Sequence, residues 1–170
     1  MTSVAHTRVL DLCRKIEEGA ARLYHRLAYV HRADGAISAL WTKTAREEEN
    51  HARQVEMVLR QRAPVARALN VDQAKAEQAL AMVQSLIGAV DATTPPVGQA
   101  LEEAITLESL LVQFHADYAV EFSEPSYQQL FRSMMAADRD HVAALENALA
   151  ALGTRTSAKN GGAGGMGEES

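Results

Sequence analysis

Apolar residues recur every three or four positions along most of this chain, which is the spacing of amphipathic α-helices, and no segment alternates as a β-strand does. Few points interrupt the pattern, chiefly the turn sequence Asp34-Gly35 and the prolines at 64, 95, 96 and 125. The interruptions predict four long helices, over residues 4–33, 36–61, 97–122 and 123–153. Pro125 falls near the first helical position of the last one.

A connector, residues 63–96, separates the second long helix from the third. It contains a shorter amphipathic stretch, with Asp72 as its expected N-cap and Pro95-Pro96 after its end. The apolar face of this stretch is formed by Leu80, Val83, Leu86, Ile87 and Val90. This face can cover the outside of its own bundle or pack against a second subunit. We expect a homodimer or a multiple of one, because two-fold pairing is the commonest closed assembly. Its interface would be formed by the connector or by the outer faces of the first two helices.

Two helices joined by a tight turn, a long connector and two further helices describe an all-α fold. They predict a four-helix bundle with one long crossover connection that contains a short helix. We assign residues 1–153 to this one domain and residues 154–170 to a flexible, glycine-rich tail.

Composition narrows the classes of partner. With 17 basic and 22 acidic residues the chain has no basic field, so no nucleic-acid partner is expected. It has no apolar run that could span a bilayer and no signal-like start, so no membrane partner is expected and a cytoplasmic setting is the default. The single cysteine, Cys13, allows no internal disulfide.

Acidic residues interrupt the apolar stripe that each long helix should turn inward. In the run Glu47-Glu48-Glu49, Glu48 and His51 align with the apolar stripe of residues 36–61, whereas Glu49 falls on the charged side. Glu47 lies between the two faces. Side chains three residues apart on a helix have Cβ atoms roughly 5–6 Å apart, so Glu48 and His51 can share one metal ion.

Comparing acidic residues with the apolar stripe in the same way places one carboxylate on the inward stripe of each other long helix. The inward residues are Glu17, Glu108 and Asp138, with His141 three positions after Asp138. The neighbouring Glu18, Glu102 and Glu103 fall on outward faces. The two halves of the chain also match, since Glu17 precedes Glu48 by 31 residues and Glu108 precedes Asp138 by 30. This repeat links four helices and is more specific than any single Glu-x-x-His pair.

Four carboxylates buried together without lysine or arginine would repel one another and lose their hydration. Two divalent cations would neutralise their charges, and His51 and His141 would each supply one neutral nitrogen ligand. Oxygen-rich sites with one nitrogen per metal suit iron or manganese, with zinc as a possible substitute.

One Glu from each of two helices and a Glu-x-x-His-like pair from each of the other two resembles the ferritin-like di-iron carboxylate proteins. More narrowly, "EEGAARLY" at 17–24 followed by "EENHAR" at 48–53 resembles the rubrerythrin branch. The resemblance implies a ferritin-like bundle with a centre of two iron ions. It also implies bridging roles for Glu48 and Asp138, terminal roles for Glu17 and Glu108, and one nitrogen ligand each from His51 and His141.

Three features depart from that family. Asp138 stands where the family usually has Glu, and Ile105 and Leu111 are apolar where an additional carboxylate would lie, three residues from Glu108. The cysteine-rich, rubredoxin-like electron-transfer domain is not seen. The resemblance therefore implies an external electron-donor protein.

Several further residues have a chemical and a packing interpretation. Tyr24 can hydrogen-bond a metal ligand or relay an electron, and it can equally be a core tyrosine. We interpret His115 as a partner of a ligand rather than a ligand, and Cys13 as a small buried hydrophobe. His31 and Trp41 are interpreted as packing or interface residues.

Two functions follow from the resemblance, and a third needs no metal. The first is an oxidoreductase that reacts with hydrogen peroxide or dioxygen, with Tyr24 and histidine assisting proton transfer. The alternative is a ferroxidase that feeds iron storage or handling. The third is a metal-free helical interaction bundle, which the unpaired inward carboxylates disfavour.

Overall fold

The computed structural model describes residues 4–61, 73–119, 122 and 124–161, and it confirms the all-α architecture. The helices are α1 Val4–Val30, α2 Gly35–Gln61, α3 Gln73–Ala92, α4 Val97–Ala119 and α5 Pro125–Gly161. None of the helices in this described part of the chain combines the length and apolar character that crossing a bilayer requires. The expected N-cap Asp72 and the expected stop at Pro64 lie outside the described residues.

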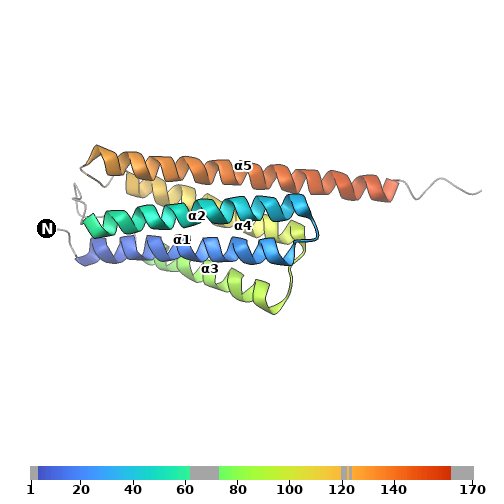
Figure 1. Ribbon diagram of the computed structural model, residues 1–170, viewed down its shortest axis with the longest axis horizontal. Helices are drawn as coiled ribbons and strands as arrows, with labels where there is room; N and C mark the ends of the chain where they lie inside the picture. The colour runs from blue at the N-terminus through green and yellow to red at the C-terminus, as the bar shows by residue number, and fades with distance from the viewer. Residues whose placement is uncertain (1–3, 62–72, 120–121, 123, 162–170) are drawn as a thin grey trace, which may run out of the picture.

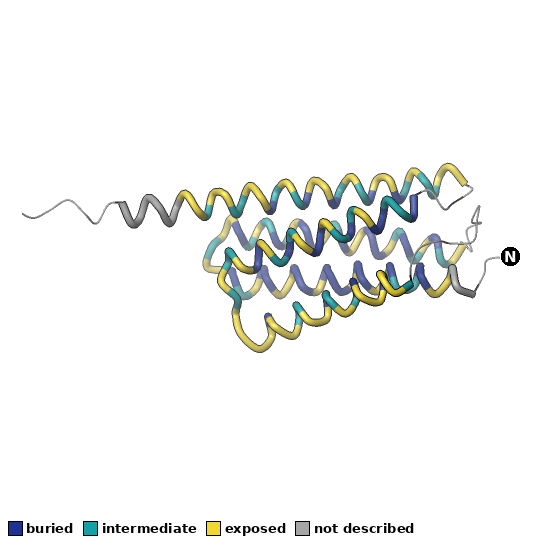
Figure 2. Tube along the Cα trace, turned by 180° about the vertical axis from the view of Figure 1, so that it is seen from behind, coloured by how far each residue is buried: buried dark blue, intermediate teal, exposed yellow. Residues whose placement is uncertain are grey.

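The four long helices form two hairpins that lie side by side (Figure 1). α1 packs against α2, α4 packs against α5, and α2 also contacts α5. α3 runs along α1 and reaches α4. Figure 2 shows the buried positions concentrated on the sides of the helices that face one another. This is the bundle with one long crossover that the sequence predicts, and its contacts are those of a ferritin-like fold.

Local hydrogen bonds explain where the first hairpin turns. Asp34 caps α2, because its Oδ1 accepts hydrogen bonds from the backbone N–H groups of Ala36 at 3.2 Å and Ile37 at 3.1 Å. The predicted end of the first helix at residue 33 is too late by three residues, since α1 ends at Val30. The Asp34 N–H bonds the His31 carbonyl at 3.0 Å, so the tight turn already begins at His31.

The predicted end of the last helix at Gly153 is wrong, because α5 continues to Gly161. A glycine inside a helix costs only about 1 kcal/mol relative to alanine, and no proline follows to block the next turn. The Thr154 hydroxyl donates a hydrogen bond to the Ala151 carbonyl at 2.9 Å across this point. The flexible tail stays a prediction for residues 162–170, which lie outside the described residues.

The crossover helix α3 covers its own bundle. Val83 and Val90 are buried, and Leu80, Leu86 and Ile87 are partly buried against the core. The close approach to α1 depends on Gly19, where an added Cβ would lie 2.6 Å from Val83 Cγ1. The sequence allowed the apolar face of the connector to pack against its own bundle or against a second subunit. The structure shows it packed against its own bundle.

Candidate metal centre

The six residues singled out for their inward position meet inside the bundle. Glu17 comes from α1, Glu48 and His51 from α2, Glu108 from α4, and Asp138 and His141 from α5. The four carboxylates are 0% exposed, and the two histidines are 6% and 4% exposed. Their predicted facing is therefore confirmed.

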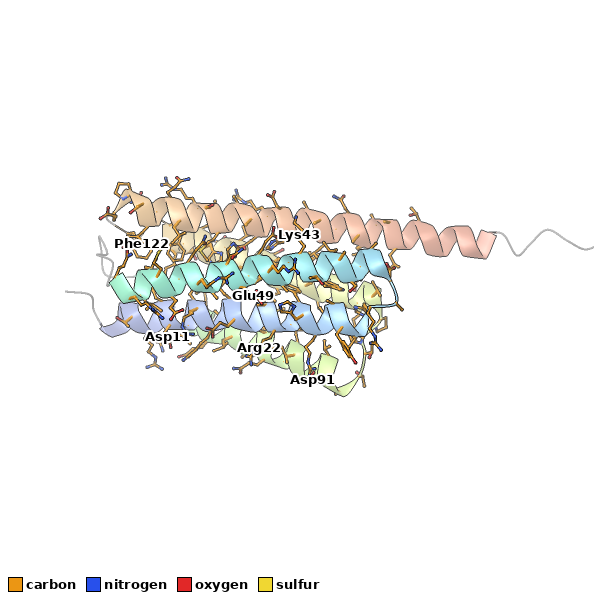
Figure 3. The ribbon with its side chains drawn as sticks, in the orientation of Figure 1. Asp11, Arg22, Lys43, Glu49, Asp91 and Phe122 are labelled. Carbon is orange, nitrogen blue, oxygen red and sulfur yellow. The ribbon has the colours of Figure 1, made fainter. Side chains whose placement is uncertain are left out.

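The neighbouring glutamates that the sequence assigns to outward faces lie at the surface of the bundle. Glu18, Glu49 and Glu102 are exposed, and Figure 3 labels Glu49 on the α1–α2 pair. Glu49 Oε1 lies 2.8 Å from His25 Nε2 in an exposed contact, and Arg14 pairs with Glu18 at 2.5 Å. Helical facing thus separates residues that are adjacent in sequence.

The clustered donors form two adjoining sets, each able to hold a cation. One set contains Glu17, Glu48 and His51, and its ligand atoms all lie within 4.8 Å of one another. The other contains Glu48, Glu108, Asp138 and His141, within the same limit. Because Glu48 belongs to both sets, two metal positions would share its carboxylate.

Both histidines of these sets turn Nδ1 toward the carboxylates. His51 Nδ1 lies 3.1 Å from Glu48 Oε2 and 3.6 Å from Glu17 Oε2. His141 Nδ1 lies 2.9 Å from Glu48 Oε1 and 3.2 Å from Glu108 Oε2. Asp138 Oδ1 lies 3.7 Å from His51 Nδ1, so Asp138 also faces the first set.

Several carboxylate oxygens in the cluster have no hydrogen-bond partner in the described structure. They are both oxygens of Glu17, Oε1 of Glu48 and Oδ1 of Asp138. The ion pairs found for these three residues are with histidines, not with lysine or arginine. Buried acceptors that lack donors are costly unless a cation binds them, so the donor set fits divalent metal ions.

The cluster holds protons at neutral pH when no metal is bound. Burial lowers the pKa of His51, but the nearby carboxylates of Glu17 and Glu48 outweigh burial and raise it to about 10. Burial also lowers the pKa of His141, but the nearby carboxylates of Glu108 and Glu48 outweigh burial and raise it to about 11. Burial, reinforced by the Glu48 charge, raises the pKa of Glu108 to about 8. Divalent cations would replace these protons as the balancing charge.

Glu47, which the sequence leaves between two faces, contacts His141. Its Oε2 lies 2.7 Å from His141 Nε2, and its side chain is 36% exposed. A proton on Nε2 that points to Glu47 leaves the Nδ1 lone pair directed at Glu48 and Glu108. Carboxylates hold metal-binding histidines in this way. The sequence carries no signal for this contact because it joins α2 to α5.

Tyr24 is fully buried beside the cluster, and its hydroxyl donates a hydrogen bond to Glu108 Oε1 at 2.5 Å. Burial and the Glu108 charge raise its pKa well above the ordinary value, so it remains a proton donor. Its ring stacks on Trp41 with centroids 5.7 Å apart. Of the roles considered for Tyr24, the hydrogen bond to a candidate ligand is therefore present.

His115 bridges two of the clustered carboxylates. Its Nδ1 lies 2.5 Å from Asp138 Oδ2 and its Nε2 lies 2.9 Å from Glu17 Oε1. Burial lowers the pKa of His115, but the negative charges of Glu17 and Asp138 outweigh burial and raise it well above its ordinary value. Burial raises the pKa of Glu17, but the positive charge of His115 outweighs burial and lowers it to about 2. Its predicted contact with candidate ligands is present.

The packing role predicted for His31 and Trp41 also has a structural basis. Trp41 Nε1 donates a hydrogen bond to His31 Nδ1 at 3.2 Å. The other ring nitrogen of His31 donates to the Pro95 carbonyl at 2.9 Å. The pair joins the α1–α2 turn to the start of the second hairpin.

A family model described as Rubrerythrin matches residues 9–149. This range includes all the clustered carboxylates and histidines described above. No curated protein and no solved structure matches the chain.

Proposed function

The chain belongs to the rubrerythrin family, and from that premise we propose that it is a di-iron oxidoreductase. The proposed reaction is the reduction of hydrogen peroxide or dioxygen with electrons from an external donor protein. The observation that carries the proposal is the buried cluster of four carboxylates and two histidines, in which several oxygens lack hydrogen-bond partners within the described part of the chain.

In this proposal Glu17, Glu48 and His51 hold one metal ion. The second is held by Glu48, Glu108, Asp138 and His141. An oxygen-rich set with one nitrogen for each position suits iron, with manganese or zinc as substitutes. When bound, the two iron ions supply the redox chemistry for cleavage of the O–O bond.

The surrounding residues would position ligands and hold protons. Tyr24 keeps a proton on its hydroxyl, which lies 2.5 Å from Glu108 Oε1, and it would act as a proton donor beside the centre. Glu47 orients His141, and His115 orients Asp138. The rings of Phe114 and Phe131 lie 6.2 Å and 6.1 Å from the His115 ring and help exclude water from this side.

The adjacent residues Glu48 and Glu49 provide a matched test. Anaerobically reconstituted protein should bind about two Fe²⁺ ions per chain and should oxidise them rapidly with peroxide in stopped-flow absorption. Glu48→Gln should lose both properties, because this carboxylate belongs to both metal sets. Glu49→Gln should retain both, because Glu49 is exposed. Equal iron binding by the two variants would contradict the proposal.

The alternative is a ferroxidase that passes iron to a store. It is favoured by the shorter side chain at Asp138 and by the apolar Leu111 and Ile105, which leave fewer carboxylates to retain iron. Rapid oxidation by dioxygen, followed by release of ferric iron into a large hollow assembly, would support this alternative. Repeated turnover with peroxide and a reductant, without iron loss, would support the oxidoreductase.

A further inference from the structure

A third group of potential ligands adjoins the two metal sets. Cys13, Glu17 and His115 are all 0% exposed, and one ligand atom of each lies within 4.8 Å of the other two. Cys13 precedes Glu17 by one turn of α1, and His115 reaches them from α4. The interpretation of Cys13 as a simple buried hydrophobe does not account for this arrangement.

The hydrogen bond from His115 to Asp138 determines which ring nitrogen is free. Its Nδ1 lies 2.5 Å from Asp138 Oδ2, and a carboxylate oxygen accepts, so Nδ1 carries the proton. The other ring nitrogen, Nε2, lies 2.9 Å from Glu17 Oε1, and this close contact lacks hydrogen-bond geometry in the described structure. In the metal-free protein a second ring proton on Nε2 balances the charge of the carboxylate. A bound cation would take the place of that proton, with Nε2 and Glu17 Oε1 as two of its ligand atoms.

Cys13 supplies a third ligand atom for such a cation. Cys13 Sγ lies 3.9 Å from His115 Nε2. Sulfur is a weak hydrogen-bond acceptor, but as a thiolate it is a strong ligand for zinc and similar metals. With metal–sulfur bonds of about 2.3 Å and metal–nitrogen bonds of about 2.0–2.1 Å, tetrahedral ligand atoms lie about 3–4 Å apart. The 3.9 Å between Cys13 Sγ and His115 Nε2 falls in this range, and the 2.9 Å between His115 Nε2 and Glu17 Oε1 lies just below it.

Glu17 can serve both this group and the di-metal centre because its two oxygens face different ways. Its Oε2 lies 3.6 Å from His51 Nδ1, whereas its Oε1 lies 2.9 Å from His115 Nε2. A bridging carboxylate uses its two oxygens in this manner. His115 would have its orientation fixed by Asp138, as metal-binding histidines usually do by a carboxylate.

We propose that Cys13, Glu17 and His115 form an accessory site for a borderline divalent metal such as Zn²⁺, Fe²⁺ or Co²⁺. On binding, the Cys13 thiol loses its proton to solvent and forms a metal–thiolate bond, with no change in oxidation state. The site shares Glu17 with the proposed di-metal centre, but it does not depend on the reaction of that centre.

Cobalt titration of the full-length apo-protein without oxygen tests the proposal. Cys13 is the only cysteine in the sequence, so any near-ultraviolet thiolate-to-cobalt charge-transfer band reports this residue. The wild type should develop the band with a third equivalent of Co²⁺. Cys13→Ser and His115→Gln should each lose the band and that equivalent, and Cys13→Ser should keep the other two.

Glu48→Gln separates this site from the di-metal centre. The variant should keep the thiolate band while losing the other two equivalents, because Glu48 is not in the Cys13 group. Two equivalents without a thiolate band in the wild type would overturn the accessory site and leave the proposed function standing. A thiolate band as the sole binding event would instead contradict the di-metal centre.

Zinc X-ray absorption of the wild type gives a second readout that needs no variant. A sulfur ligand at about 2.3 Å is expected when zinc exceeds two equivalents. Oxygen and nitrogen ligands alone at that loading would overturn the accessory site. This outcome would leave His115 as an imidazolium held between Glu17 and Asp138.

Discussion

At the scale of single residues, three consecutive glutamates have three different environments. Glu48 is fully buried among candidate ligands, Glu49 is exposed and pairs with His25, and Glu47 is half-buried against His141. Consecutive helical residues are rotated by about 100°, so a single turn distributes its side chains to the core, the surface and the boundary. Identical side chains therefore have different chemical roles.

The contact between Glu47 and His141 leads to a prediction about metal affinity. Glu47→Ala should weaken binding of Mn²⁺ by about 10–100-fold, because His141 loses the carboxylate that orients it. Glu49→Ala is the matched control, because Glu49 contacts a histidine on the surface, His25, at 2.8 Å, close to the 2.7 Å between Glu47 and His141. Calorimetric titration should show no change for this control. Equal affinities for all three proteins would mean that Glu47 does not position His141.

A second prediction concerns protons. At pH 7 the raised pKa values of His51, His141 and Glu108, about 10, 11 and 8, keep these groups protonated in the metal-free protein. Metal ligands must lose these protons, so binding of Mn²⁺ should release about three per chain and should tighten as pH rises. Above pH 8 the release should fall, since Glu108 is then already ionised.

The proton release is measured by titration calorimetry in buffers with different ionisation enthalpies. The observed heat should vary in proportion to the buffer's ionisation enthalpy. A heat that is the same in every buffer would show that the histidines are unprotonated before metal binds. The Mn²⁺ ion is suitable because it prefers oxygen and nitrogen ligands and leaves the Cys13 thiol unbound.

At the scale of elements, the position of α3 depends on a small residue in α1. Gly19 has room for no side chain, because an added Cβ would lie 2.6 Å from Val83 Cγ1. Val83 is β-branched and cannot easily rotate away within a helix. The apolar face of the crossover can therefore approach α1 closely and cover it.

Gly19→Ala should lower the free energy of unfolding by about 1–3 kcal/mol, because α3 must shift to relieve the overlap. Gly88→Ala is the matched control in α3, since an added Cβ there meets nothing within 4 Å. That change should raise stability by roughly 0.5–1 kcal/mol through helix propensity. Urea unfolding of the two variants measures both effects. Stabilisation by Gly19→Ala would show that α3 does not pack closely on α1.

At the scale of the whole molecule, metal binding should be linked to folding. Of the two proposed metal positions, the one formed by Glu48, Glu108, Asp138 and His141 draws ligands from α2, α4 and α5, so it exists only when both hairpins are together. Adding Fe²⁺ or Mn²⁺ to the apo-protein at about 100 times the dissociation constant should add about 2.7 kcal/mol per site. The melting temperature should rise by several degrees for the wild type and for Glu49→Gln, but not for Glu48→Gln. An unchanged wild-type melt would contradict a buried site.

The homodimer stays a prediction for the full-length chain. Because α3 already covers its own bundle, the outer faces of α1 and α2 are the more suitable of the two interfaces considered. These helices carry the large exposed apolar residues Tyr29 and Met57, 63% and 47% exposed. Sedimentation velocity should give the mass of a dimer or of a multiple of one. A stable monomer at micromolar concentrations would contradict the prediction.

The sequence by itself determined which side of each helix faces inward. The inward stripes contain Glu17, Glu48, Glu108 and Asp138, and the structure buries all of them while leaving Glu18 and Glu49 exposed. This succeeds because facing depends on the regular rotation per residue, which is a local property of the helix. The four long helices and the crossover could be predicted for the same reason.

Tertiary structure alone decided the contacts between helices. The pairing of Glu47 with His141 joins residues 94 positions apart, and the contact of Cys13 with His115 spans 102 positions. The fit of Val83 against Gly19 likewise depends on how closely two helices approach. Such contacts depend on the distance, rotation and register of packed helices, which the periodicity of a single helix does not contain.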